Sequence, residues 1–277
     1  MLCTVTATGI TITATMAIMR RLGQAKRRPN TTGRTEPALG LPLPSLASTQ
    51  PTADARVLAR LMTWLSPAYP VGGYSYSHGL EWAVEARKVI DAGTLGSWIE
   101  DILSHGAGRS DAIFLAEAWR AAAAGNERLL AETVELAAAL TPSAERRLET
   151  LAQGAAFLTA TQAVWPVPGL ERLAAEGAEV VYPVAVGACA AAHHLPLAAT
   201  AQAFVQAFAA SLVSAGVRLI PLGQTDGLRV LARLEPSIPL IVAEALAASL
   251  DNLGGAAVAA DIASMRHETQ YTRLFRS

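Results

Sequence analysis

A long stretch without charged side chains limits what this chain can fold into. No Asp, Glu, Lys or Arg occurs between residues 180 and 217. Such a segment either lies inside a protein core or crosses a membrane. Pro183 and Pro196 interrupt it, and the part after Pro196 contains only seven Leu, Val or Phe residues, the types that favour membrane insertion. We therefore predict two buried core helices that separate near Pro196.

Hydrophobic residues elsewhere recur at the three- and four-residue spacing of helices. One such face comprises Val57, Leu58, Leu61, Met62 and Leu65. Alanine, the best helix former, supplies much of a composition that is 52% hydrophobic and only 16% charged. Outside the first 15 residues, no stretch shows the sustained alternation of a β-strand. We therefore predict an all-α fold, a single globular domain of about nine or ten helices with a disordered N-terminal extension.

Composition divides the chain into three parts. Residues 1–52 are the predicted disordered extension and linker, residues 53–265 the helical domain, and residues 266–277 a C-terminal tail that binds a partner. Six basic residues and no acidic one fall within residues 1–34, which leaves 16 basic against 23 acidic residues in the rest of the chain. Because an acidic body attracts few phosphates, we expect no nucleic-acid partner.

The residues with reactive side chains do not assemble an active site or a metal site. His193 and His194 are adjacent, so on a helix their side chains point about 100° apart and cannot easily share a metal. Gly72-Gly73 lacks the downstream lysine of a phosphate-binding loop, and the nearby serines lack a nucleophile elbow. The two cysteines are too few for a disulfide framework and fit a reducing compartment. We expect no enzymatic activity, no cofactor, no bound metal and a cytoplasmic location.

The segment PVGGYSYSHGLE, residues 70–81, interrupts the helical pattern with glycines and tyrosines. Rigid aromatic side chains beside small residues make good interface anchors, because their burial costs little rotamer entropy. Two interpretations of Tyr74 and Tyr76 remain open at this point. They face a partner, or they pin this bend onto the core of their own chain.

The tail RHETQYTRLFRS, residues 266–277, combines charge with the buriable side chains of Tyr271, Leu274 and Phe275. A polar terminus usually frays. One that carries three such side chains can instead fold onto a partner. A disordered end is the alternative.

Three motifs together resemble one family. LSPAYPVGGYSYSHGLE at 65–81, VRLIPLGQTDGLRVL at 217–231 and SMRHETQYTRLFRS at 264–277 are similar, in this order, to segments of the urease accessory protein UreF family. The resemblance extends from about Leu58 to Ser277, whereas the first 50 residues match nothing typical of the family.

The resemblance implies a non-enzymatic scaffold or chaperone for urease maturation. Members of the family are all-α proteins that form a homodimer and bind the accessory protein UreD, also called UreH. This assembly then recruits the GTPase UreG and the urease apoprotein for nickel insertion. A helical membrane-associated or metal-dependent protein unrelated to urease is the alternative.

Three segments are the partner-binding candidates that the resemblance implies. In the bend they are Tyr74, Ser75, Tyr76, Ser77, His78 and Glu81. In the second motif they are Arg218, Gln224, Thr225 and Asp226, which the resemblance places on the UreG side. In the tail they are Arg266, His267, Glu268, Tyr271, Arg273, Leu274, Phe275 and Arg276.

Overall fold

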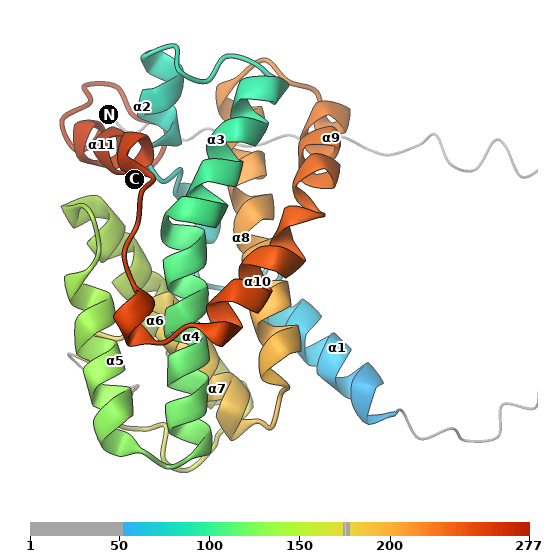
Figure 1. Cartoon of the computed structure of the whole chain (residues 1–277), viewed down its shortest axis with the longest axis vertical. Coiled ribbons are helices and arrows are strands. Elements are labelled where there is room, and N and C mark those ends of the chain that lie inside the picture. Colours follow the sequence, from blue (N-terminus) through green and yellow to red (C-terminus); the bar gives the residue numbers. More distant parts are fainter. Residues whose placement is uncertain (1–51, 174, 176–177) are drawn as a thin grey trace, which may run out of the picture. The chain divides into compact units, whose positions relative to one another are not determined.

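The computed structural model describes residues 52–173, 175 and 178–277, which belong to one compact unit (Figure 1). The predicted disordered extension, apart from Thr52, lies outside the described residues. No β-strand occurs in these ranges, so the predicted all-α class is confirmed. Their eleven α-helices are α1 (Ala53–Trp64), α2 (Leu80–Glu85), α3 (Ala92–His105), α4 (Ala107–Ala123), α5 (Glu127–Ala139), α6 (Ala144–Val164), α7 (Tyr182–Ala192), α8 (Leu197–Leu219), α9 (Gln224–Leu234), α10 (Ser237–Ala247) and α11 (Val258–His267). Two short 3₁₀ helices, η1 (Gly73–Ser75) and η2 (Leu250–Asn252), lie between them.

Helix α7 forms the centre of the core. Every residue from Pro183 to Ala191 is buried, mainly against α4 and α6. The side chains of α7 are mostly small, which allows its backbone to approach its neighbours closely. At Gly187 an added Cβ would lie 2.3 Å from the Leu115 carbonyl oxygen of α4, so only glycine fits at this crossing. The first half of the uncharged stretch is therefore a core helix, as predicted.

Helix α8 is the second half of the uncharged stretch. It packs against α9, α10 and α4 through residues such as Phe204, Val205 and Leu212. In the described part of the chain it alone is long and apolar enough to cross a membrane, with 39% of its most apolar stretch buried. A core helix satisfies the same criterion, so this single helix is weak support for a membrane span. A further part of the surface of α8 faces α1, which covers it only in part.

The α4–α7 crossing can be tested with G187A. We expect this substitution to lower the free energy of unfolding by about 1–3 kcal/mol, because the two backbones must move apart to admit the new methyl group. The matched control is G93A in α3, where the added Cβ would lie 3.4 Å from the nearest atom, Asp91 Oδ1. It should raise stability by about 0.5–1 kcal/mol, since alanine favours a helix over glycine. Urea unfolding followed by circular dichroism measures both, and equal effects would contradict the close crossing.

Candidate functional site

The three sequence motifs meet at one place in the structure. Arg218, near the C-terminal end of α8, donates from Nη1 to the Tyr74 carbonyl oxygen in the bend at 2.7 Å. The Cζ atom of the same guanidinium lies 4.4 Å from the ring centroid of Phe275 in the tail, a cation–π contact. One arginine thus joins segments that are far apart in the sequence. This junction is the candidate site.

The tail runs along the bend through main-chain hydrogen bonds. The Arg276 N–H donates to the Ser75 carbonyl at 2.8 Å, and the Ser77 N–H donates to the Ser277 carbonyl at 2.6 Å. The Ser77 hydroxyl also donates to this Ser277 carbonyl and is buried. Ser77 is therefore engaged in holding the tail, which leaves its hydroxyl poorly placed to act as a nucleophile. The tail docks on its own chain, and its binding to a partner stays a prediction.

The bend lies directly against α11, where the tail begins. Gly79 has φ +74°, and a Cβ built on it would lie 2.4 Å from the Ser264 backbone nitrogen. A larger residue would both strain this left-handed backbone and collide with α11. The glycine therefore fixes the distance between the bend and the helix that leads into the tail.

Two glutamates, Glu81 of α2 and Glu145 of α6, bind the tail. The Glu81 carboxylate of α2 accepts the Leu274 N–H at 2.6 Å and the Phe275 N–H at 2.8 Å. The buried His267 ring lies between two carboxylates, with Nε2 3.2 Å from Glu81 Oε2 and Nδ1 2.6 Å from Glu145 Oε2. Arg273 donates to the other oxygen of Glu145 at 2.5 Å. The tail thus connects α2, α6 and α11 through one cluster of charged and polar groups.

A second polar cluster lies deeper, on α6. Arg146 forms an ion pair with Glu149, and His78 Nε2 lies 2.8 Å from Glu149 Oε1. Ser277 donates its hydroxyl to Glu149 at 2.6 Å, so the tail also reaches this cluster. Burial alone would raise the pKa of Glu149, but Arg146, His78 and the Ser277 hydroxyl lower it to about 2. Glu149 therefore stays ionised, whereas burial and Arg146 lower the pKa of His78.

Asp111 of α4 is the unpaired acid of this region. Burial raises its pKa to about 7, although Arg146 opposes the rise. A cavity of about 160 Å³, lined by Tyr74, His78, Glu149 and Arg218, shares Asp111 and Arg146 with a second cavity of about 140 Å³ that Asp261 also lines. Among the described residues no group of three or more His, Cys, Asp or Glu side chains is arranged to hold a metal ion.

The partner-binding candidates separate by exposure. Those in contact with solvent are Tyr74, Arg218, Gln224, Thr225, Arg266, Glu268, Tyr271, Arg273, Leu274 and Arg276. Those buried in their own chain are Tyr76, Ser77, His78, Glu81, His267 and Phe275, with Ser75 and Asp226 intermediate. Tyr76 is buried and pins the bend onto its own chain, whereas Tyr74 is exposed and its contact with a partner stays a prediction.

The second motif contributes only in part to the junction. Arg218 lies in it, but Gln224, Thr225 and Asp226 form the first turn of α9. Asp226 accepts the Gly223 N–H at 3.2 Å and pairs with Arg229 at 2.6 Å. These contacts cap the helix, which is a local structural role.

Sequence reasoning missed the residues of α6 that support the site. Arg146, Glu149, Thr150 and Gln153 are all buried on one face of α6. Their spacing of three, four and seven residues forms a polar stripe at helical periodicity, a signal that was available in the sequence. Charged residues at such spacing usually form a solvent-exposed helix face. The burial of this stripe depends on the neighbouring helices, which the sequence pattern of α6 alone does not indicate.

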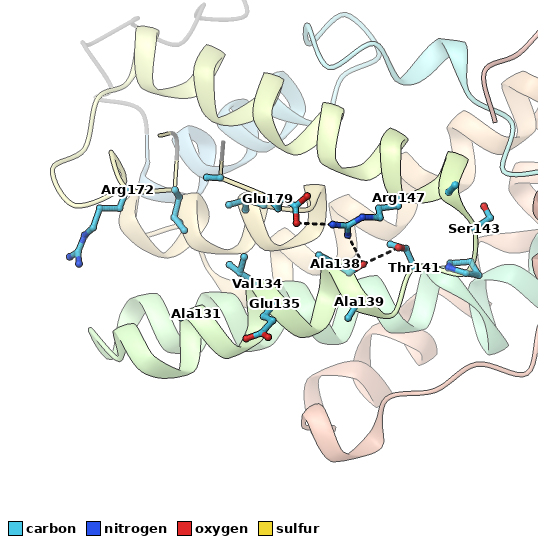
Figure 2. Close-up of a pocket in the computed structure, with 15 residues that line it drawn as sticks. Ala131, Val134, Glu135, Ala138, Ala139, Thr141, Ser143, Arg147, Arg172 and Glu179 are labelled. Atoms are coloured by element: carbon cyan, nitrogen blue, oxygen red, sulfur yellow. Dashed lines mark hydrogen bonds and ion pairs between the residues drawn. The ribbon is translucent and has the colours of Figure 1, made fainter. Parts of the chain in front are cut away.

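A wide surface groove lies away from these motifs. It has a volume of about 900 Å³ and is bounded by α5, the start of α6, residues 172–173 and residues 178–180. Figure 2 shows Arg147 at its wall, where the guanidinium donates to Glu179 at 2.7 Å and to the Ala138 carbonyl at 3.0 Å. None of the partner-binding candidates lines this groove.

Comparisons with known proteins identify related chains. The family model named UreF matches residues 89–235. The urease accessory protein UreF of Rhodopseudomonas palustris (strain HaA2) is 58% identical over 222 residues, which cover 79% of this chain and 93% of that protein. The proteins of the same name from Bradyrhizobium diazoefficiens and Xanthobacter autotrophicus are 54% and 56% identical, each over 81% of this chain and 93% of the relative.

The raised pKa of Asp111 predicts that D111N changes the stability of the protein by an amount that depends on pH. A carboxyl whose pKa is raised to about 7 keeps its proton in the folded state after the unfolded chain has lost it. The stabilising contribution of Asp111 is therefore complete below about pH 4 and is lost as the pH rises through about 7. Relative to the unmodified chain, D111N should gain roughly 2 kcal/mol of stability between pH 5 and pH 8. Urea unfolding at both pH values measures this, with the exposed-site variant D101N as control, and a pH-independent difference would contradict it.

Proposed function

Since the chain belongs to the UreF family of urease accessory proteins, we propose that it serves urease maturation as a scaffold to which the other maturation proteins bind. Membership of an accessory-protein family implies a non-catalytic role and contact with other maturation proteins. In our proposal this chain forms a homodimer, binds UreD (UreH), and with it recruits the GTPase UreG and the urease apoprotein for nickel insertion. We place this assembly in the cytoplasm.

The observation that carries the proposal is the exposed apolar surface around the tail. Tyr74 is 72% exposed, Leu274 is 67% exposed, and Tyr271 is fully exposed. All three lie on segments that Arg218, Phe275 and Glu81 hold in place. Large apolar side chains on rigid backbone are typical anchors of protein interfaces. We assign this face, the bend–tail face, to UreD.

Two other surfaces fit the remaining partners. A groove between α1 and α8 is lined mostly by apolar residues, among which Leu58 and Met62 are more than half exposed. We assign this groove to the second copy of the homodimer. The start of α9 exposes Gln224, Thr225 and Leu228, and we assign it to UreG.

The bend–tail face can be tested with the double variant Y271S/L274S. Because both side chains are exposed, their loss should leave helicity unchanged and weaken binding of UreD by about tenfold or more. The matched control is L240S in α10, since Leu240 is 72% exposed and lies outside the three motifs. Co-purification and titration with UreD measure the effect. Equal recovery of UreD by all three proteins would remove this face from the proposal.

A further inference from the structure

We propose that the two adjoining cavities at Asp111 form a binding site for a small alkylammonium compound, and that Asp111 receives its charged group. The first cavity, of about 160 Å³, and the second, of about 140 Å³, share the side chains of Asp111 and Arg146. Cavities that combine apolar walls with a few polar groups are the usual form of small-molecule sites. This site lies within the single chain and does not depend on the proposed function.

Two carboxyl groups line these cavities without a partner. Asp111 of α4 lines both cavities, and Asp261 of α11 lines the second. Neither carboxyl forms a hydrogen bond or an ion pair with another described residue. Burial raises the pKa of both groups, that of Asp111 to about 7. Since a buried charge is normally paired, a cation is the group that these two carboxyls lack.

The neighbouring basic side chains do not supply this cation. Arg146 lines both cavities, but it forms its ion pair with Glu149. His78 also faces Glu149, and burial and Arg146 lower its pKa, so its ring is neutral near pH 7. Arg218 lines the first cavity, but it is exposed and donates to the Tyr74 carbonyl. The two unpaired carboxyls are therefore left without a compensating charge.

The walls of the first cavity suit an alkyl chain that ends in an ammonium group. Tyr182, Phe204 and Phe208 line this cavity together with Asp111. Aromatic rings attract cations through their faces, and their burial against alkyl carbon is favourable. An ammonium group has three N–H donors and can serve more than one carboxyl oxygen. A bare metal ion fits less well, because within the described ranges no three His, Cys, Asp or Glu side chains are arranged to hold one.

Binding of n-propylammonium to the full chain is the direct test. We expect a dissociation constant on the order of 1 mM at pH 8, which is within the limit for a ligand of about four non-hydrogen atoms. Saturation-transfer NMR and calorimetry measure it, with sodium chloride at equal ionic strength as the reference. The neutral probe n-propanol has nearly the same size and no charge, and it should bind roughly tenfold more weakly or less.

The variant D111N tests the residue that receives the charge. It should weaken binding of n-propylammonium by about tenfold or more, whereas D101N, at an exposed position of α3, should leave binding unchanged. Because the pKa of Asp111 is about 7, the affinity of the unmodified chain should rise by roughly tenfold between pH 6 and pH 8. D111N should lose most of this rise. A purely structural role of Asp111 would change the stability of the chain without producing this pH profile.

Two outcomes would overturn the site. Equal binding of n-propylammonium and n-propanol, or no binding of either, would show that the cavities hold water alone. Tighter binding of a capped lysine, acetyl-lysine methylamide, than of n-propylammonium would assign the ammonium group to a protein side chain instead of a small molecule. Either outcome leaves the proposed scaffold role untouched, because no partner protein takes part in these measurements.

Discussion

The burial of α7 is the constraint on which the rest of the structure depends. A helix without charged side chains has to be enclosed, and the small residues of α7 let α4 and α6 enclose it at backbone distance. At Gly154 of α6, an added Cβ would lie 2.0 Å from the Val180 carbonyl oxygen that precedes α7. This close packing fixes the rotation of α6 and so directs Arg146 and Glu149 inward. The polar cluster that receives the tail is therefore a consequence of how tightly the apolar core is closed.

Two acids of the site, Glu149 and Asp111, have different electrostatic environments. Glu149 has three partners that favour its ionised form, whereas Asp111 has only Arg146 to offset burial. Both acids face the same cavity. Glu149 stays ionised although it is less exposed than Asp111, because it has more partners that favour the charged form. Glu149 is already ionised, and the Ser277 hydroxyl of the tail donates a further hydrogen bond to it. This bond helps to hold the tail over Glu149.

Much of the fold could be predicted from the sequence, but less of the site. The absence of charge from residue 180 to 217, the break at Pro196 and the helical spacing of hydrophobic residues are local signals, and each predicted an element that the structure contains. The junction of Arg218, Tyr74 and Phe275 depends on tertiary packing, which no local pattern encodes. Glu81 illustrates the limit. The resemblance implies that it binds a partner, and the structure buries it against the main chain of its own tail, a contact that no local pattern predicts.

The burial of Ser277 has a practical consequence for work with this protein. Its carbonyl and hydroxyl are both engaged, with Ser77 and Glu149, in a closed interior position. Because Ser277 is 1% exposed, an affinity tag or fluorescent protein fused after it would have to displace it from this position. An assay that uses such a fusion would therefore observe an arrangement that the label itself has produced.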